Sequence, residues 1–174
     1  NKYPSKIEKY CEPFVGGGAV LFDVLSRHHP ETVLINDINK ELINTYNQIK
    51  NNCSKMVILL SELQNIYKSH TLEENKAFFY EKRTRYNELK VNGNELENLE
   101  KAALFIFLNK TCFNGLYRVN SKGQFNVPFN NAKKPLLCDK DNLLACSELL
   151  KNVNMQFGDY KECKNFIDKG TFVY

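Results

Sequence analysis

The chain has 174 residues, of which 43% are hydrophobic and 25% are charged, and its formal net charge at pH 7 is +4. This composition is typical of a soluble globular protein with one good core, and so mild a charge does not by itself indicate a nucleic-acid partner. No apolar run approaches the ~18 residues of a membrane span and no signal-peptide pattern opens the chain, so neither a membrane protein nor a secreted one is indicated.

The cysteines and histidines show no metal-ligand spacing. Six cysteines are scattered without a Cys-x-x-Cys pair, and His28, His29 and His70 stand apart from them. We therefore predict reduced thiols in a cytoplasmic protein without a metal site. The chain begins without Met and ends on the apolar run 171–174, so we expect it to be a piece of a longer protein.

The first predicted elements are a strand, a glycine turn and a helix. Residues 6–14 favour a strand that runs into Gly16, Gly17 and Gly18, and residues 19–25 carry apolar side chains at helical spacing. In this arrangement a backbone can approach a ligand without a Cβ in the way. The glycines do not form the G-x-G-x-x-G pattern of dinucleotide sites, and an ordinary glycine-rich loop is the alternative.

A second predicted strand, at 32–35, ends at Asn36 and Asp37. Asp37 follows Gly17 by twenty residues. In nucleotide-binding α/β units, an acidic residue about 20 positions after the glycine turn accepts hydrogen bonds from ribose hydroxyls. The alternative role for Asp37 is to cap the following helix, and the two roles are compatible. The pattern favours a ligand that contains a nucleoside.

The period stays helical from residue 54 to residue 110. Ser54 is a candidate cap for one helix, Thr71 and Glu74 form a capping box for a second, and the apolar run 99–108 predicts a third that is buried on most sides. A basic cluster at 82–85 has two interpretations, a contact with phosphates or a solvated helix face.

The segment 109–135 holds five basic residues, no acidic one and seven amide side chains. Its middle predicts a β-hairpin, in which runs at 116–119 and 125–127 are joined by a turn at 121–123. Positive charge, amides and aromatic side chains on such a hairpin are what a surface facing nucleic acid requires. A basic, solvated loop is the alternative.

The α/β pattern resumes after Pro135. It predicts a helix that starts at Asp139 or Asp141, a strand around 155–157, a helix at 161–169 and a further strand from residue 171. Ligands of doubly wound sheets bind beyond the carboxyl ends of the strands, where Glu12, Asp37 and Asp159 are expected.

Four segments together resemble one family, the Dam-type DNA adenine methyltransferases. YCEPFVGGGAVLF and VLINDINKELINTYNQIK resemble its first two cofactor motifs, LNKTCFNGLYRVNSKGQFNVPF is similar to its target-recognition hairpin, and FGDY resembles its third cofactor motif. The resemblance implies an α/β fold: a Rossmann-like methyltransferase sheet formed by residues 1–53 and 136–174, and a mainly helical target-recognition insertion at 54–135 that carries the hairpin.

The family's activity is then expected. It is the transfer of a methyl group from S-adenosylmethionine (SAM) to N6 of adenine in duplex DNA, with base flipping and without a metal ion. The hairpin's similarity favours a GATC-containing site. The resemblance also implies a cytoplasmic, monomeric enzyme of a restriction–modification system or a phage, with a cognate restriction endonuclease as a further partner.

The resemblance assigns cofactor residues. Asp37 would hold the ribose hydroxyls of SAM, and Asp159 its adenine amino group with Tyr160 nearby. The methionine part would be lined by Glu12, Pro13, Phe14, Gly16, Gly17 and Gly18.

It also assigns DNA-binding residues. Phe113 and Asn114 would enter the base stack, and Arg118 would form a bidentate pair with a guanine edge. The further residues expected at bases or phosphates are Leu116, Asn120, Pro128, Lys133 and Lys134.

Three family features are missing. The catalytic tetrapeptide Asp-Pro-Pro-Tyr is expected just after Tyr174, so no catalytic residue is assigned and the isolated chain is predicted to be inactive. The Phe-x-Gly-x-Lys segment is absent, and Asn130-Asn131-Ala132 replaces a Gly-Arg-Tyr type segment. Two other classes are alternatives: a non-catalytic DNA-binding module, and a SAM-dependent enzyme acting on RNA or a small molecule.

Overall fold

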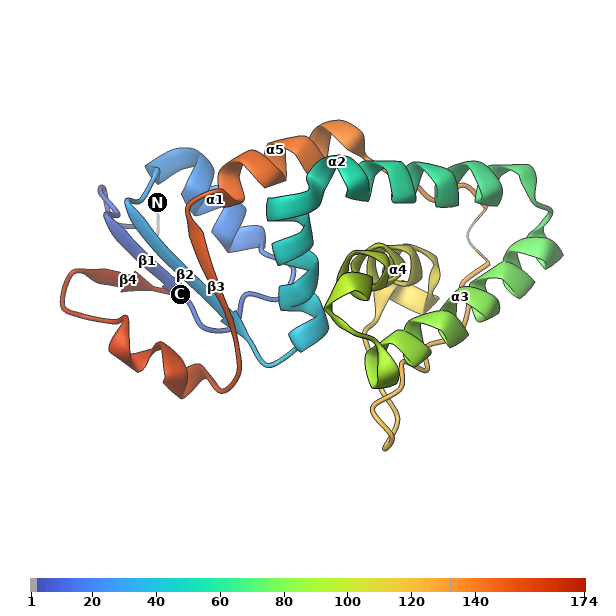
Figure 1. The fold of residues 1–174 in the computed structure, drawn as a ribbon. Coiled ribbons are helices and arrows are strands. Elements are labelled where there is room, and N and C mark those ends of the chain that lie inside the picture. Colours follow the sequence, from blue (N-terminus) through green and yellow to red (C-terminus); the bar gives the residue numbers. More distant parts are fainter. Residues whose placement is uncertain (1–2, 132) are drawn as a thin grey trace. The chain divides into compact units, whose positions relative to one another are not determined.

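The computed structural model describes residues 3–131 and 133–174 and divides into two compact units (Figure 1). The sheet unit comprises residues 1–51 and 144–174, and the helical unit comprises residues 52–143. The helices and strands, in chain order, are β1 (Lys9–Glu12), α1 (Ala19–His28), β2 (Thr32–Asp37), α2 (Lys40–Ser69), α3 (Leu72–Asn92), α4 (Asn98–Thr111), α5 (Lys140–Leu150), β3 (Val153–Phe157) and β4 (Thr171–Val173). The described residues also form the short 3-10 helices η1 (Glu95–Glu97), η2 (Phe113–Gly115) and η3 (Tyr160–Asn165).

The sheet unit is built on a parallel sheet with the strand order β3-β2-β1-β4. β1 pairs with β2 and with β4, and β2 pairs with β3, all in parallel. A doubly wound nucleotide-binding sheet begins with this order, and its strand order reverses between β1 and β4. The predicted α/β class with a parallel sheet is confirmed.

Both faces of the sheet are covered, which explains why its strands are nearly continuous apolar runs. Val33 and Ile35 of β2 pack in one core with Leu21 of α1. Leu34 lies between them in sequence and points to the opposite face, where it packs with Cys163 of η3. Figure 1 shows α1 and η3 on opposite sides of the strands.

The helix after β2 is longer than predicted. A separate helix beginning at Ser54 was expected, but α2 runs from Lys40 to Ser69 and is interrupted only at Asn52, where φ is −132° and ψ is 29°. One non-helical residue therefore separates the two segments, and a loop with its own capping residue is not needed.

The predicted helix 161–169 is wrong in its second half, because η3 ends at Asn165. Asp168 ends it: its carboxylate Oδ1 accepts hydrogen bonds from the Gly170 N–H at 2.9 Å and from the Thr171 hydroxyl at 3.0 Å. Local bonds of this kind favour a turn over a helix, and they direct the chain into β4.

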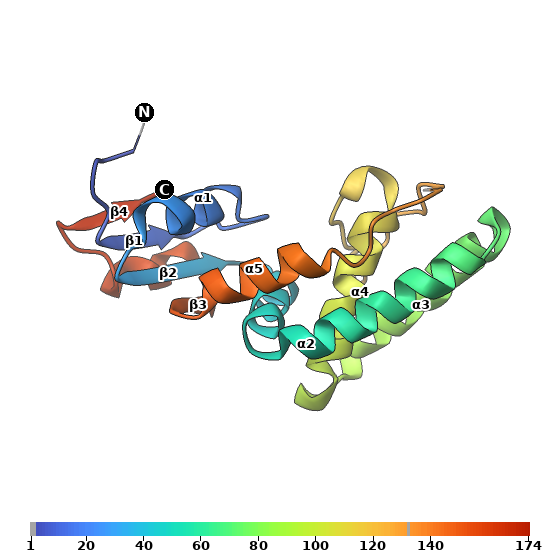
Figure 2. The ribbon, with the colours of Figure 1, turned by 90° about the horizontal axis from the view of Figure 1, so that it is seen from above.

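The helical unit packs α4 against α2 and α3 (Figure 2). Phe107 of α4 forms edge-to-face pairs with Tyr67 of α2 and Phe78 of α3, at centroid distances of 6.2 and 5.5 Å. The predicted capping box is confirmed, since the Glu74 N–H donates to the Thr71 hydroxyl and the Thr71 N–H donates to the Glu74 carboxylate. Within the described ranges, none of the helices combines the length and the apolar character that crossing a membrane requires.

Candidate cofactor and nucleic-acid sites

The glycine turn (13–18) joins β1 to α1 in the sheet unit. Gly16 and Gly18 have φ values of 49° and 72°, a left-handed conformation that favours glycine. A Cβ added at Gly18 would come within 2.5 Å of the Tyr46 hydroxyl oxygen. Space for a ligand at the turn is therefore on the side of Gly16 and Gly17, where a Cβ would meet no atom within 4 Å.

Hydrogen bonds from β2 and α2 hold this turn in place. The Gly16 N–H donates to the Asp37 carboxylate at 3.0 Å, and the Tyr46 hydroxyl donates to the Gly16 carbonyl at 2.9 Å. The Val15 N–H donates to the Asn36 carbonyl at 3.0 Å. The N–H and the carbonyl of Gly16 are thus both hydrogen-bonded, to Asp37 and to Tyr46. These bonds fix the turn before any ligand binds.

The predicted cofactor residues of the turn divide into a buried and an exposed group. Glu12 is only 3% exposed, and its carboxylate accepts a 2.6 Å hydrogen bond from the Tyr10 hydroxyl. Burial raises the pKa of Glu12, against the opposing effect of hydrogen bonds from Tyr10 and from the Leu21 backbone at the start of α1. Pro13 is also buried, whereas Phe14 is 70% exposed. Glu12 and Pro13 support the turn, and Phe14 is available to a ligand.

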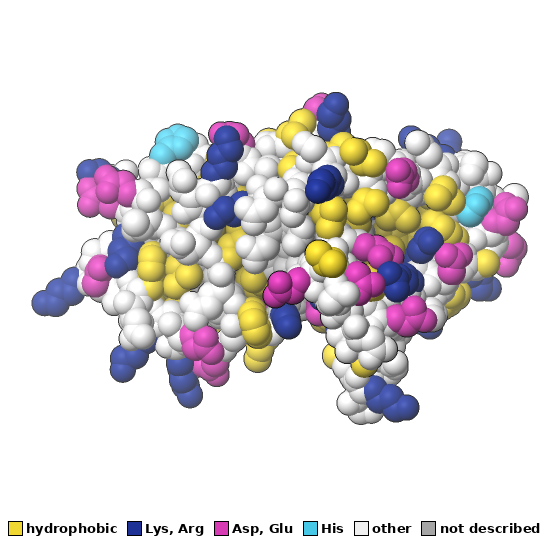
Figure 3. Space-filling view, in the orientation of Figure 1, with side chains coloured by type: hydrophobic (Ala, Val, Ile, Leu, Met, Phe, Trp, Pro, Cys, Tyr) yellow, Lys and Arg dark blue, Asp and Glu magenta, His cyan; other side chains and the backbone are white. Residues whose placement is uncertain are grey.

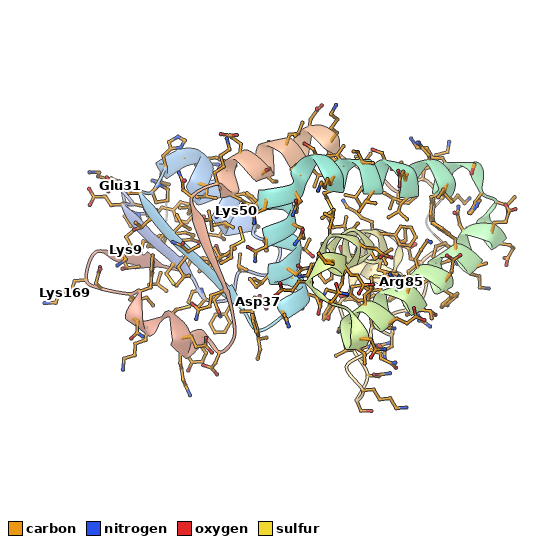
Figure 4. All side chains as sticks on the ribbon, in the orientation of Figure 1. Lys9, Glu31, Asp37, Lys50, Arg85 and Lys169 are labelled. Atoms are coloured by element: carbon orange, nitrogen blue, oxygen red, sulfur yellow. The ribbon has the colours of Figure 1, made fainter. Side chains whose placement is uncertain are left out.

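Asp37 is the last residue of β2 (Figure 4 labels it), and Asp159 lies just beyond the end of the neighbouring strand β3. Asp37 accepts hydrogen bonds from the N–H groups of Gly16 and Asn39, at 3.0 and 2.9 Å. A carboxylate has about four acceptor positions, so Asp37 keeps acceptors for a ligand. Asp159 is exposed and accepts from the Lys161 N–H at 2.9 Å, which caps η3.

An apolar pocket of about 640 Å³ lies at the carboxyl ends of β1 and β4, within the sheet unit. Phe14 and Tyr160 line it with their rings 5.4 Å apart, and Lys161, Lys164 and Tyr174 also contribute. The pocket is in the size range of ligand sites and lies where the strand order reverses, the usual ligand position in such sheets.

Ile38 is an apolar neighbour of the site that sequence reasoning did not select. It is 82% exposed and comes directly after Asp37, between β2 and α2. The available signal was a large aliphatic residue between two polar ones in a connection where water is expected. An exposed Ile38 beside the Asp37 carboxylate offers an apolar surface on which a planar ligand group can stack.

The basic ribbon (109–135) lies in the helical unit and has hairpin topology. Its arms form isolated antiparallel bridges, Cys112 with Phe129 and Val119 with Phe125, and its turn places Gly123 at a φ of 72°. The predicted turn is present, but the predicted arms form no continuous ladder. Contacts with α3 explain the difference.

Three side chains of α3 bond the backbone of the returning arm. Asn87 donates to the Phe125 carbonyl at 3.1 Å and accepts from the Phe125 N–H at 2.8 Å. Arg83 donates to the Val127 carbonyl at 3.3 Å, and Lys90 donates to the Gly123 carbonyl at 2.7 Å. We call Arg83, Asn87 and Lys90 the α3 contact row. It bonds backbone groups of every second residue, Gly123, Phe125 and Val127, as a neighbouring strand would.

The basic residues at 82–85 make contacts within the protein, and these contacts were neither of the two expected roles. Arg85 donates to both carboxylate oxygens of Glu100, at 2.9 and 2.8 Å, and to Glu97 at 3.2 Å (Figure 4 labels Arg85). Lys82 pairs with Glu81 at 2.8 Å. On the face shown in Figure 3, Lys and Arg side chains are interspersed with Asp and Glu.

The ribbon has one buried and one exposed side. Phe125, Val127 and Phe129 are 3%, 1% and 8% exposed, as expected for alternate residues of an extended arm that pack inward. All of the residues predicted to bind DNA are exposed: Phe113, Asn114, Leu116, Arg118, Asn120, Pro128, Lys133 and Lys134. Ala132, one of the positions where the family pattern is replaced, lies outside the described residues.

Two of these exposed residues have defined conformations. The Arg118 guanidinium donates to the Asn126 side-chain oxygen at 2.8 Å and to the Asn126 carbonyl at 3.3 Å, which holds it along the ribbon. Asn114 has a φ of 53°, a left-handed conformation that asparagine tolerates. The ribbon therefore presents an arginine held by Asn126 and an exposed aromatic ring, Phe113.

Nowhere in residues 3–131 and 133–174 do three or more His, Cys, Asp or Glu side chains gather as a metal-ion site requires. Within the described residues, the cysteines form no disulfide bond. Burial raises the pKa of Cys11 to about 12, which makes its thiolate scarce at neutral pH.

Comparison with known proteins agrees with the resemblance. The family model described as D12 class N6 adenine-specific DNA methyltransferase matches residues 1–174. The chain is 45% identical to the type II methyltransferase M.MjaIII of Methanocaldococcus jannaschii, over 97% of this chain and 57% of the relative. It is 35% identical to the type II methyltransferase M1.LlaDCHI of Lactococcus lactis subsp. cremoris, over 98% of this chain and 56% of the relative.

A third relative is a DNA adenine methylase of Haemophilus influenzae, which is 30% identical over 99% of this chain and 55% of the relative. The chain thus spans little more than half the length of these curated relatives. Because the family model matches from the first residue to the last, the chain belongs to the D12 class N6 adenine-specific DNA methyltransferase family.

Proposed function

We propose that this chain belongs to a site-specific methyltransferase that moves a methyl group from SAM to N6 of adenine in duplex DNA. The observation that carries the proposal is the presence, in one chain of this family, of a preorganised glycine turn bonded to Asp37 and an exposed basic ribbon. The first suits an adenosyl ligand and the second suits a nucleic acid.

The sheet unit is proposed to bind SAM. Asp37 keeps carboxylate acceptors for the ribose hydroxyls, and the exposed Asp159 is proposed to accept from the adenine amino group. Ile38 and Tyr160, 82% and 50% exposed, offer apolar surfaces for the purine. The exposed side of the glycine turn, with Phe14, is left for the methionine part.

The basic ribbon is proposed to bind DNA. Arg118 can turn a planar guanidinium toward a guanine edge, a pairing worth about 1–3 kcal/mol of discrimination. Phe113, 51% exposed, can take the stacking position that a flipped base leaves. Lys133 and Lys134 are proposed to neutralise phosphates, with Asn114, Leu116, Asn120 and Pro128 at the surrounding bases and sugars.

When bound, SAM supplies an electrophilic sulfonium methyl group to the exocyclic nitrogen of adenine. The residues of this chain would contribute by binding and orientation, which can provide a large part of a rate enhancement. We propose a monomeric, cytoplasmic enzyme of a restriction–modification system, with a cognate endonuclease, since two relatives are named type II methyltransferases. A target containing GATC is proposed from the similarity of the ribbon.

Calorimetric titration of the chain with S-adenosylhomocysteine, and fluorescence titration with labelled duplex DNA, test the proposal. We expect both ligands to bind, and we expect DNA binding to weaken steeply as salt rises. Binding of duplex DNA without any S-adenosylhomocysteine binding would favour a DNA-binding module instead. Binding of S-adenosylhomocysteine without a preference for duplex DNA would favour a methyltransferase of another substrate class.

A further inference from the structure

Asn36, next to Asp37 near the end of β2, makes contacts that the proposed function does not use. Its side chain is 1% exposed, and its Nδ2 donates hydrogen bonds of 3.1 Å to the Pro13 carbonyl and 3.1 Å to the Gly158 carbonyl. Pro13 starts the glycine turn after β1, and Gly158 follows β3. One amide group therefore links the loops that follow the two strands flanking β2.

The link lies where the regular sheet pairing stops. The ladder between β1 and β2 ends at the Glu12–Ile35 pair, and the ladder between β2 and β3 ends at the Asp37–Phe157 pair. Beyond them, the Gly158 N–H donates to the Asp37 carbonyl at 3.1 Å. Side-chain bonds from Asn36 continue the cross-connection from the strands into the loops.

Gly158 has a backbone conformation that favours glycine. Its φ is +147°, and a Cβ added there would come within 2.6 Å of the Glu162 carboxylate. Both its N–H and its carbonyl are bonded to β2, to the Asp37 carbonyl and the Asn36 amide. Asn36 and Asp37 thus both bond the glycine turn and the Asp159 loop (158–160), and Asn36 is the residue whose side-chain amide bonds both loops at once.

The chemistry of the position favours a geometric role. The Asn36 side-chain oxygen is buried and has no hydrogen-bond partner among the described residues. An unpaired buried polar atom costs about 1–3 kcal/mol, a cost that an aliphatic side chain of similar volume would not incur. The two hydrogen bonds from Nδ2 offset this cost, so what the amide provides at this site is the pair of donors that it directs to the two loops.

We propose that Asn36 is a positioning residue for the methyl donor, which fixes the distance between the glycine turn and the Asp159 loop. The inference rests on the proposed function, in which the two loops hold opposite ends of SAM. A ligand that reaches both loops gains from their fixed separation, whereas a ligand that reaches only one does not.

Two probes separate these cases: S-adenosylhomocysteine, which reaches both loops, and 5′-methylthioadenosine, which lacks the amino-acid end. In Asn36→Leu we expect affinity for S-adenosylhomocysteine to fall about tenfold, the factor that corresponds to one net hydrogen bond, and affinity for 5′-methylthioadenosine to change by less than about threefold. Calorimetry on the whole chain measures both constants.

Controls keep the test independent of folding. If the leucine variant folds poorly, Asn36→Ser is the second variant. Serine retains one donor, so we expect its affinity for S-adenosylhomocysteine to fall by less than tenfold. Asn47→Ala is the matched control, because within the described residues the Asn47 amide donates to the Ile43 carbonyl of its own helix, at 3.2 Å, and bonds neither loop. We expect no change in either affinity. Circular dichroism and thermal melting verify that each variant is folded.

The outcomes are distinct. A larger loss for S-adenosylhomocysteine than for 5′-methylthioadenosine supports the positioning role. Equal losses, or none, in folded variants overturn it and leave Asn36 a part of the fold while the proposed function stands. If the unaltered chain binds neither probe, the proposed cofactor site and this inference are both rejected.

Discussion

The two units fix their exposed functional segments in different ways. In the sheet unit, the glycine turn and the Asp159 loop are continuations of parallel strands, and the side chains of Asn36 and Asp37 extend the strand pairing into them. In the helical unit, the described residues of the basic ribbon form isolated bridges and single hydrogen bonds between the arms, and the α3 contact row bonds the backbone of one arm from outside. Loops at strand ends need few added bonds, whereas a ribbon without a ladder depends on a neighbouring helix and on its own buried side chains.

The largest effect is expected when a buried side chain of the ribbon is removed, because the ribbon depends on its packing against α3. Phe125 is 3% exposed and packs against Tyr86 and Tyr117, so Phe125→Ala should destabilise the ribbon and α3 by about 3 kcal/mol. Hydrogen exchange of the ribbon amides measures the loss. Phe113→Ala, on the exposed side, is the control and should change protection little. If Phe125→Ala and Phe113→Ala reduced the protection of the ribbon amides equally, the ribbon would not have one buried and one exposed side.

The corresponding change in the sheet unit is Asp37→Ala. It removes the acceptor for the Gly16 and Asn39 N–H groups and the proposed ribose contact, so affinity for S-adenosylhomocysteine should fall about 30-fold or more. Asp23→Ala, which removes a carboxylate that pairs with Arg27 on α1, should leave the calorimetric affinity unchanged. Binding that survives Asp37→Ala would show that the turn holds its shape and its ligand without this carboxylate.

A smaller effect is expected where the ribbon meets DNA. Arg118→Ala should lower affinity for a duplex containing GATC about tenfold, and should scarcely change affinity for a duplex without that site. Lys122→Ala, at the exposed turn, should weaken binding to both duplexes equally, because a phosphate contact carries no sequence information. Fluorescence anisotropy on the unaltered chain and both variants provides the six constants that this comparison needs. The same loss on both duplexes in Arg118→Ala would assign Arg118 to the phosphates.

The smallest effect concerns the ion pair between Arg85 of α3 and Glu100 of α4. Hydrogen bonds from Arg85 lower the pKa of Glu100 from its ordinary value of 4.5. The pair's contribution is therefore complete above pH 4.5 and is lost as pH falls through the lowered pKa. Since both side chains are 41% exposed, Glu100→Gln should reduce stability only slightly at pH 7 and flatten the acid limb of a melting-temperature profile. A large loss at neutral pH would show that this pair fixes α3 and, through it, the ribbon.

Local patterns in the sequence were sufficient for the strands of the sheet, the glycine turn, the capping box at Thr71 and the turn of the ribbon. Each depends on hydrogen bonds or periodicities within a few residues, which a sequence displays directly. Family motifs added the membership that the comparison confirms. The early end of η3 was missed even though its cause, Asp168, is local, because a turn and a helix compete there on nearly equal terms.

Only the tertiary structure decided which side chains hold these elements in place. Asn87 bonds Phe125 across 38 positions of sequence, and Asn36 bonds Gly158 across 122. No local pattern marks either asparagine, since each would serve equally well as a cap or a solvated amide. The sequence by itself determined the sheet, the turn and the charge of the ribbon, because local propensity and hydrophobic period act within each segment. Long-range hydrogen bonds form only after distant segments meet, and they decide the spacing of the loops and the attachment of the ribbon.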